Sequence, residues 1–217
     1  MTKKIITFGE IMGRLASPDF LRLRQCHSFD VTYAGAEASV AVSIANFSGD
    51  VAYVSALPKH AIADAALDSL RSFGVNTEYV IRSDIGRLGL YFLETGANQR
   101  PSRVIYDREY STISLTSPSS YDWDDIFKDA EWIHLSGITP ALSALAAEST
   151  LIAAKKAKSK NIKVSLDLNF RKNLWNWSEN KNSQELAKET MNKILPYVDV
   201  LIANEEDCSD VLGIKAD

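Results

Sequence analysis

Segments with the pattern of β-strands alternate with segments with the pattern of α-helices along most of the chain. Short apolar runs that end in glycine, proline or polar residues occur at residues 4–9, 51–57, 131–135, 162–168 and 198–203. Between them, apolar residues recur at helical spacing, as at residues 36–47 and 61–73. Because strands joined by helices pair in parallel through right-handed crossovers, we expect an α/β protein with a doubly wound, mostly parallel sheet.

One stretch breaks this alternation. Residues 88–94 and 104–106 are strand-like, and the segment between them contains glycine and proline but no helical pattern. We therefore expect a small antiparallel lid at about residues 85–115, completed by an earlier strand within residues 15–34.

The two faces of this lid differ in character. Leu90 and Phe92 point to one face of the predicted strand, whereas Tyr91 points to the other, because side chains alternate along a strand. A thin lid cannot cover both of its own faces. We expect one face to meet the domain and the other to meet a second subunit in a homo-oligomer.

Size and charge narrow the class of protein. A chain of 217 residues, 46% of them hydrophobic, suits one globular domain with a small appendage. The net charge of -4 argues against a nucleic-acid surface, and no apolar run approaches the roughly 20 residues that span a bilayer. Cys26 and Cys208 are too few for a disulfide framework, and neither has a histidine at metal-ligand spacing. We expect a cytoplasmic protein without a secretion signal, a membrane contact or a zinc site.

Polar residues follow three of the predicted strands, at 136–139, 167–171 and 204–207. In an open α/β sheet, ligands bind where strands end at their carboxyl edge. A single cluster of this kind is commonly a helix cap or a solvated turn. Three clusters at one edge favour a binding site.

Two of these clusters carry specific chemistry. Arg171 suits a carboxylate or a phosphate, because its planar guanidinium makes paired charge-assisted hydrogen bonds. The alternative is a surface arginine lying over Trp175 or Trp177. The acidic residues after Asn204 suit magnesium, which prefers oxygen ligands, although acids are also common at a helix N-terminus.

Two further segments could reach the same edge. Gly35 lies in a turn of small residues that enters a helix, which permits either close approach of a ligand or a plain packed turn. The lid offers Tyr91, Tyr106 and Arg108, which could hold an acidic sugar, although Tyr91 can equally be strand packing. The chain has neither a G-x-x-x-x-G-K-[ST] phosphate loop nor a G-x-G-x-x-G fingerprint, which disfavours Walker-type ATP binding and a dinucleotide site.

Taken in order, these motifs resemble those of the PfkB (ribokinase-like) carbohydrate kinases, and within them the kinases of 2-keto-3-deoxygluconate. The matching segments are residues 35–37, 104–108, 136–139, 167–175 and 204–207, of which 167–175 is the most specific. The resemblance covers the whole chain.

The resemblance implies a ribokinase-like fold and phosphate transfer from ATP, with Mg²⁺, to the 6-hydroxyl of 2-keto-3-deoxygluconate or a similar sugar acid. The implied substrate residues are Gly35, Tyr91, Tyr106, Arg108, Ile138 and Arg171. The arginines would face the carboxylate, Asn169 and Asn204 would serve the nucleotide, and Asp207 would serve the metal.

The chain departs from the family pattern at three points. Ser39 stands where the family usually has asparagine, and Asp207 stands where it usually has glutamate. The Gly-Ala-Gly-Asp motif, whose aspartate is the catalytic base of the family, is absent. We therefore expect residues 1–217 to form an incomplete domain, with the base beyond residue 217 and no turnover by these residues alone.

Two other functions remain open from the sequence. One is a fructokinase or another sugar kinase of the same family, and the other is a truncated domain that binds a sugar without catalysis. A pair of arginines in the pocket favours an acid, because a neutral sugar would leave both guanidinium groups without a counter-charge.

Overall fold

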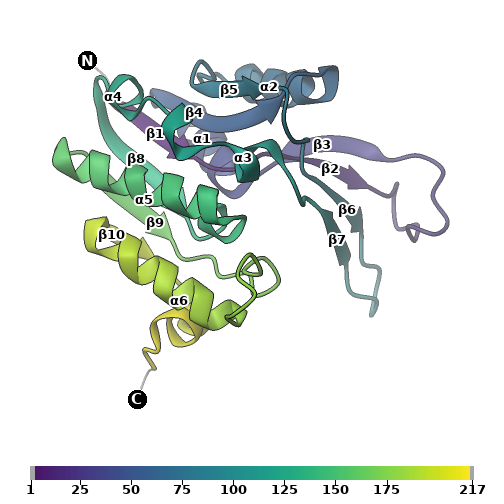
Figure 1. Cartoon of the computed structure of the whole chain (residues 1–217). Helices are drawn as coiled ribbons and strands as arrows, with labels where there is room; N and C mark the ends of the chain where they lie inside the picture. Colours follow the sequence, from purple (N-terminus) through teal and green to yellow (C-terminus); the bar gives the residue numbers. More distant parts are fainter. Residues whose placement is uncertain (1–2, 216–217) are drawn as a thin grey trace.

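A six-stranded sheet forms the centre of the molecule, in the order β10-β9-β8-β1-β4-β5 (Figure 1). The structure, a computed structural model, describes residues 3–215. The strands of this sheet are β1 (Lys4–Phe8), β4 (Val51–Pro58), β5 (Val80–Ser83), β8 (Ala130–Ser136), β9 (Lys163–Asp167) and β10 (Val200–Ile202). All neighbouring strands run parallel, which confirms the prediction from the alternating pattern.

Helices cover both faces of this sheet. The longer ones are α1 (Ala36–Asn46), α2 (Ala61–Ser72), α5 (Ala144–Ser159) and α6 (Ser183–Ile194), and the short ones are α3 (Thr112–Leu115), α4 (Trp123–Ile126) and α7 (Glu205–Asp207). α5 and α6 pack on one face, whereas α1 and α2 pack on the other (Figure 1). The predicted doubly wound architecture is therefore confirmed.

Two apolar cores result, one on each side of the sheet. Ile6 and Phe8 of β1 are fully buried in the core beneath α5 and α6. Val51 and Tyr53 of β4 are buried in the core beneath α1 and α2. Because side chains alternate along a strand, a continuous apolar strand such as β4 supplies both cores at once.

Local signals set several element ends. Asn182 and Glu185 form a capping box at the start of α6. Gly74 follows α2 with a φ of +84°, which a residue without a Cβ adopts readily. The last strand is shorter than predicted and ends at Ile202, because Asn204 already caps the next helix.

A second, four-stranded sheet projects from the first and forms the lid (Figure 1). Its order is β3-β2-β6-β7, with β2 (Met12–Ala16), β3 (Asp30–Ala34), β6 (Leu90–Glu94) and β7 (Arg103–Asp107). β6 and β7 make the antiparallel hairpin, and β2 runs parallel to β6 and antiparallel to β3. β2 follows β1 after residues 9–11, a connection that the sequence analysis did not recognise as the link between the two sheets.

Across residues 3–215, none of the helices combines the length and the apolar character needed to cross a lipid bilayer.

Candidate functional site

Three strands of the main sheet end side by side. Ser136 at the end of β8 pairs with Asp167 at the end of β9, and Asp167 pairs with Ile202 at the end of β10. Backbone hydrogen bonds continue past the strands, from Gly137 N to Asp167 O and from Leu168 N to Ile202 O, each 2.8 Å long. The three polar clusters predicted from the sequence therefore leave neighbouring strands at one edge of the sheet.

A pocket of about 390 Å³ lies between this edge and the lid. It is lined by each residue that the sequence analysis assigned to the substrate and also by Asn169, namely Gly35, Tyr91, Tyr106, Arg108, Ile138, Asn169 and Arg171. The remaining lining residues are Glu10, Met12, Ala34, Ala36, Ser39, Lys172, Asn173 and Leu174. A hollow under a lid, with polar and charged side chains converging on a partly apolar wall, is a common form of a small-molecule site.

The lid contributes an aromatic wall. Tyr91 of β6 and Tyr106 of β7 are paired across the hairpin, with ring centroids 5.8 Å apart. Burial raises the pKa of Tyr91, so that its hydroxyl stays protonated and able to donate a hydrogen bond near neutral pH. The strand packing considered from the sequence is thus present, and it leaves both rings on the pocket wall.

Arg108 enters the pocket as a buried, paired cation. It follows β7, and its guanidinium lies 5.7 Å from the centroid of the Tyr106 ring. Its Nη2 donates a hydrogen bond to Oε2 of Glu10, which lies between β1 and β2. No motif in the sequence indicates a role for Glu10, although this residue follows a strand end at the same edge of the sheet.

A buried carboxylate fastens the two sides of the pocket together. Glu37, in the first turn of α1, is fully buried and accepts hydrogen bonds from Ser136 Oγ at 2.5 Å and Thr139 Oγ1 at 3.0 Å. Burial raises its pKa, and the two hydroxyl donors oppose that rise. Ser136 Oγ also accepts from the backbone N–H of Ile138 at 3.0 Å. This network fixes Gly35 and Ile138 relative to each other.

Gly35 must be a glycine for a steric reason. A Cβ at this position would lie 2.0 Å from the carbonyl oxygen of Glu10. The N-terminus of α1 can therefore approach the β1–β2 connection only without a side chain there. The packed-turn alternative is therefore realised at Gly35, and the same turn brings the helix start onto the pocket wall.

Arg171 projects from the loop after β9. Its side chain is exposed on the pocket rim, and its Nη1 donates to the carbonyl oxygen of Phe170 at 3.2 Å. Trp175 is buried in the core, and Trp177 donates its indole N–H to the carbonyl oxygen of Pro140. Both tryptophans are thus engaged elsewhere, and Arg171 lines the pocket.

Asn169 lies beside Arg171 in an unusual backbone conformation. Its φ is +36°, and its backbone N–H donates to Asp167 Oδ1 at 3.2 Å. Asparagine tolerates the left-handed region better than most residues. This turn directs the chain from the end of β9 along the pocket wall.

Asn204 and Asp207 lie farther along the same edge and are not among the residues that line the pocket. The side chain of Asn204 accepts a hydrogen bond from Asp207 N at 2.6 Å and so caps α7. The helix-cap alternative is therefore realised at Asn204. The nucleotide role assigned to Asn204 from the sequence stays a prediction.

Asp207 is a buried carboxyl group in a mixed electrostatic environment. Burial raises its pKa most, and the nearby carboxylates of Asp167 and Glu206 raise it further. Hydrogen bonding with the Phe170 backbone and the charge of Arg171 lower it. A cation at this point would relieve the repulsion between the carboxylates.

Within residues 3–215, no three side chains among His, Cys, Asp and Glu are grouped so as to hold a metal ion. Magnesium is nevertheless commonly bound by one or two carboxylates together with substrate phosphates and water. The donors present fit that mode of binding and not a cage made by the protein alone.

His134 lies on β8 and is buried. Its ring Nδ1 is 3.0 Å from Ser165 Oγ, and burial lowers its pKa, which keeps the ring neutral near pH 7. It does not line the pocket.

Comparison with known proteins agrees with this architecture. The model of the pfkB family carbohydrate kinases matches residues 2–217, so the chain belongs to that family. A 2-dehydro-3-deoxygalactonokinase of Haloferax volcanii is 36% identical over 217 residues, which are the whole of this chain and 65% of that protein.

Solved structures of carbohydrate kinases also superpose closely on this chain. The crystal structure of a 2-dehydro-3-deoxygluconokinase from Thermotoga maritima superposes with a TM-score of 0.93 at 47% identity, covering 99% of this chain and 64% of that one. A fructokinase with bound ATP from Xylella fastidiosa superposes with a TM-score of 0.83 at 25% identity, covering 99% of this chain and 66% of that one. The chain thus spans about 65% of the length of the first relative and 64% of the first structure.

Proposed function

We propose that the protein binds a sugar acid in this pocket and transfers phosphate to it from ATP. The preferred substrate is 2-keto-3-deoxygluconate or its galactonate epimer, and the acceptor is the 6-hydroxyl. The observation that carries the proposal is the convergence of Tyr91, Tyr106, Arg108 and Arg171 on one pocket beneath the lid. The names of the 36% and 47% identical relatives support the same substrate class.

The roles of the lining residues follow from their chemistry. Arg171 is exposed on the rim and meets the substrate carboxylate, because its guanidinium carries no carboxylate partner within the described part of the chain. The tyrosines cover the sugar and donate hydrogen bonds. Gly35 and Ile138 shape the wall on either side of the Glu37 network.

ATP and Mg²⁺ belong to the next part of the edge. Asn169 and Asn204 stand beside the strand ends where a nucleotide would extend from the pocket. Asp207 would hold the metal together with phosphate oxygens, and the metal would neutralise charge on the transferred phosphate. The fructokinase relative with bound ATP supports this choice of phosphate donor.

The catalytic base is not supplied by residues 1–217 in this proposal. Among the described residues that line the pocket, Glu10 provides the carboxylate, and that carboxylate is buried in an ion pair with Arg108. A base must be free to take the proton of the attacking hydroxyl. We therefore expect the 217-residue polypeptide to lack kinase turnover on its own.

We also propose a cellular compartment and an oligomeric state for the protein. Cys26 and Cys208 are both free thiols, which suits the cytoplasm. The apolar face of the lid that is turned away from the pocket suits a second copy of the chain, and hence a homo-oligomer.

A coupled kinase assay of the full-length protein tests the proposal. The panel contains 2-keto-3-deoxygluconate, 2-keto-3-deoxygalactonate, fructose and ribose, each with ATP and Mg²⁺. We expect the sugar acids to exceed the neutral sugars in kcat/KM by at least tenfold. Preference for fructose would favour the fructokinase alternative. Binding of a sugar acid without ATP consumption would favour the non-catalytic alternative.

A further inference from the structure

We propose that Arg14 of β2 binds the carboxylate of the sugar acid from the lid, opposite Arg171 at the edge of the main sheet, and so helps to select an acid over a neutral sugar. This role rests on the proposed function. No motif in the sequence indicates Arg14. Three features of this residue support the role: the face of the lid on which it lies, its distance from the pocket wall and its uncompensated charge.

Arg14 lies on the pocket side of the lid. It pairs with Thr32 of β3 on one side and with Tyr91 of β6 on the other. Tyr91 in turn pairs with Tyr106 of β7. Paired residues on neighbouring strands point to the same face of a sheet. Because Tyr91 and Tyr106 both line the pocket, Arg14 stands in the same row and on the same face as this aromatic wall.

Arg14 is not among the lining residues, but the pocket wall comes within one step of it in two directions. Met12, two positions earlier on β2 and on the same face, lines the pocket and is roughly 7 Å away along the strand. Tyr91 is the lining neighbour on β6. Burial raises the pKa of Tyr91, and the positive charge of Arg14 partly offsets that rise, which places the guanidinium near the ring. An arginine side chain is long enough to bridge one such step and reach a molecule in the pocket.

The side chain of Arg14 is half-buried, and its charge has no carboxylate partner in the described part of the chain. Its Nη1 donates a hydrogen bond to Thr32 Oγ1 at 3.2 Å, which is a neutral partner. Asp30 lies on the same face, opposite Ala16, but among residues 3–215 it is not an ion-pair partner of Arg14. A partly desolvated cation with spare N–H donors favours an anion, because a guanidinium makes paired charge-assisted hydrogen bonds with a carboxylate.

Two arginines that are free to respond to an anion thus lie on opposite walls of the pocket. Arg171 projects from the loop after β9, and its Nη1 donates to the carbonyl oxygen of Phe170. Neither Arg171 nor Arg14 has to break an ion pair in order to turn towards a ligand, whereas Arg108 is held by Glu10. We therefore expect Arg14 to exchange its hydroxyl partner for the carboxylate of the sugar acid, which is then held between Arg14 and Arg171.

The charge of Arg14 defines what it selects. A guanidinium donates hydrogen bonds and carries a fixed positive charge. A carboxylate gains from both properties, whereas an uncharged group of similar shape gains from the hydrogen bonds alone. A matched pair of ligands isolates this difference, namely 2-keto-3-deoxygluconate and its carboxamide, in which a neutral amide replaces the carboxylate.

Calorimetric binding of both ligands to the full-length protein tests the role. We expect the wild type to bind the acid at least about tenfold more tightly than the carboxamide. Arg14→Ala should weaken binding of the acid about tenfold and binding of the carboxamide by no more than about threefold. The matched control is Arg103→Ala, which removes the same charge from the exposed start of β7, opposite Glu94 and thus on the other face of the lid. This control should leave both affinities within about twofold of the wild type.

Melting temperatures show whether the variants fold, because Arg14 is half-buried in the middle of β2. If Arg14→Ala does not fold, Arg14→Gln decides, since glutamine keeps a hydrogen-bond donor on a long side chain but removes the charge. In Arg14→Gln the preference for the acid over the carboxamide should fall at least about threefold.

Equal weakening of the acid and the carboxamide in the Arg14 variants would mean that Arg14 only supports the lid, and would overturn the carboxylate contact. Unchanged binding of the acid in these variants would overturn it as well, and so would equal binding of the two ligands by the wild type. Each of these results leaves phosphate transfer to a sugar acid intact. Failure of the wild type to bind any sugar acid would instead remove the proposed function, and the role of Arg14 with it.

Discussion

The two arginines that line the pocket differ in burial and in their protein partners. Arg108 is buried and held by Glu10, whereas Arg171 is exposed on the rim and has only the carbonyl oxygen of Phe170 as its protein partner within the described residues. The charge of Arg108 is already balanced. Arg171 is therefore the arginine better placed to respond to the charge of an incoming anion.

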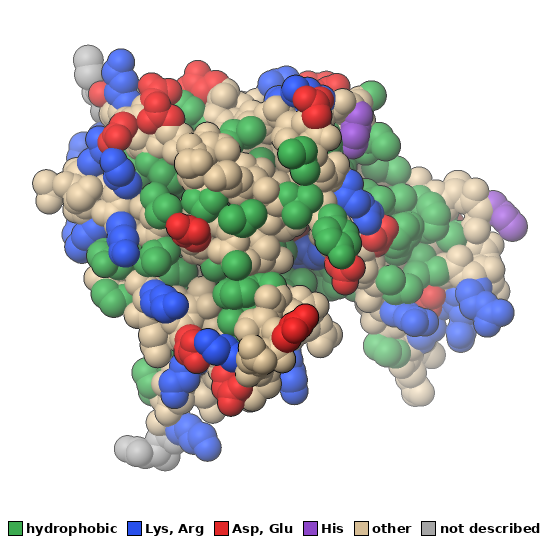
Figure 2. Space-filling view, in the orientation of Figure 1, with side chains coloured by type: hydrophobic (Ala, Val, Ile, Leu, Met, Phe, Trp, Pro, Cys, Tyr) green, Lys and Arg blue, Asp and Glu red, His purple; other side chains and the backbone are tan. Residues whose placement is uncertain are grey.

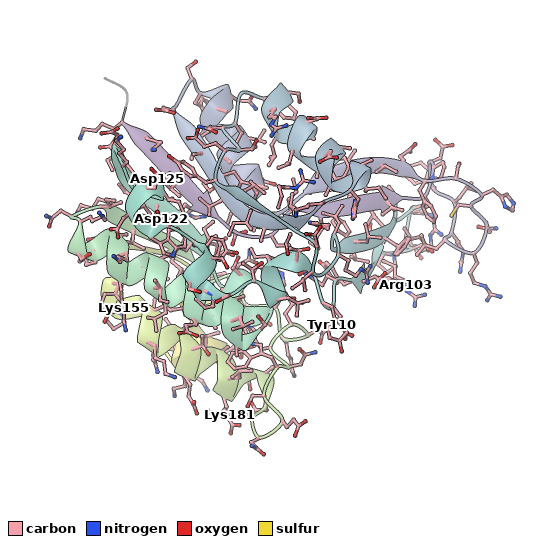
Figure 3. All side chains as sticks on the ribbon, turned by 45° about the horizontal axis from the view of Figure 1, so that its top comes forward. Arg103, Tyr110, Asp122, Asp125, Lys155 and Lys181 are labelled. Atoms are coloured by element: carbon pink, nitrogen blue, oxygen red, sulfur yellow. The ribbon has the colours of Figure 1, made fainter. Side chains whose placement is uncertain are left out.

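This difference leads to a prediction for Arg171→Ala in the full-length protein. We expect kcat/KM for the sugar acid to fall about 10- to 100-fold, because a charge-assisted hydrogen bond contributes roughly 1.5–3 kcal/mol. The control is Arg103→Ala, since Arg103 lies on the lid at the exposed start of β7 (Figure 3). A decrease no larger than that of the control would remove Arg171 from the substrate site.

One carboxylate links the outermost strand of the main sheet, β10, to β9 and α5. Asp199, just before β10, accepts hydrogen bonds from Val164 N of β9 at 3.0 Å and from Lys158 Nζ of α5 at 2.7 Å. Lys163 adds a third positive contact at 3.4 Å. β10 is therefore held at the edge both by its backbone ladder and by this side chain.

The stability of that arrangement should depend on pH. The hydrogen bond from Lys158 and then that from Val164 lower the pKa of Asp199 from 3.8 to about 2. A carboxyl whose pKa is lower in the folded state stabilises the fold above its unfolded pKa, and this contribution disappears as the pH falls toward about 2. We expect Asp199→Asn to lower the free energy of unfolding by about 1 kcal/mol at pH 7.

Urea denaturation at several pH values measures this effect. The difference between wild type and Asp199→Asn should shrink below about pH 4. The control is Asp30→Asn, at the exposed start of β3. A difference that stays constant from pH 7 to pH 3 would contradict the assignment of the shift to Asp199.

The lid presents an apolar face to the outside of the molecule. Leu15, Val31, Phe92 and Ile105 are neighbours across the four strands, on the face opposite Tyr91 and Tyr106. Val31 and Ile105 remain 54% and 41% exposed. Figure 2 shows hydrophobic side chains gathered on the lid. Contiguous apolar surface of this kind commonly marks a protein interface.

We therefore expect Ile105→Lys to weaken self-association of the protein, measured as molar mass by light scattering. A lysine at the centre of an apolar contact would have to be buried without a partner. Val104→Lys is the matched control, because Val104 is 42% exposed but points to the opposite face of the same strand. Equal masses for the two variants would exclude this face as the interface.

The sequence predicted more of the fold than of the site. The alternating pattern predicted the parallel sheet, and the polar residues after three strands predicted which edge carries the pocket. β2 was missed, because Met12–Ala16 contains a glycine and an arginine and carries a weak strand pattern. Glu10 was missed for a related reason, since a single carboxylate after a strand has many possible roles.

The sequence alone determined the alternation of strands and helices in the main sheet, the capping box of α6 and the residues available at the strand ends. These depend on local periodicity and on neighbours a few positions apart. The tertiary structure decided which distant residues meet, as with Glu10 and Arg108, or Glu37 and Ser136. Such contacts arise when the lid and α1 close on the sheet, and residues almost a hundred positions apart leave no periodic trace in the chain.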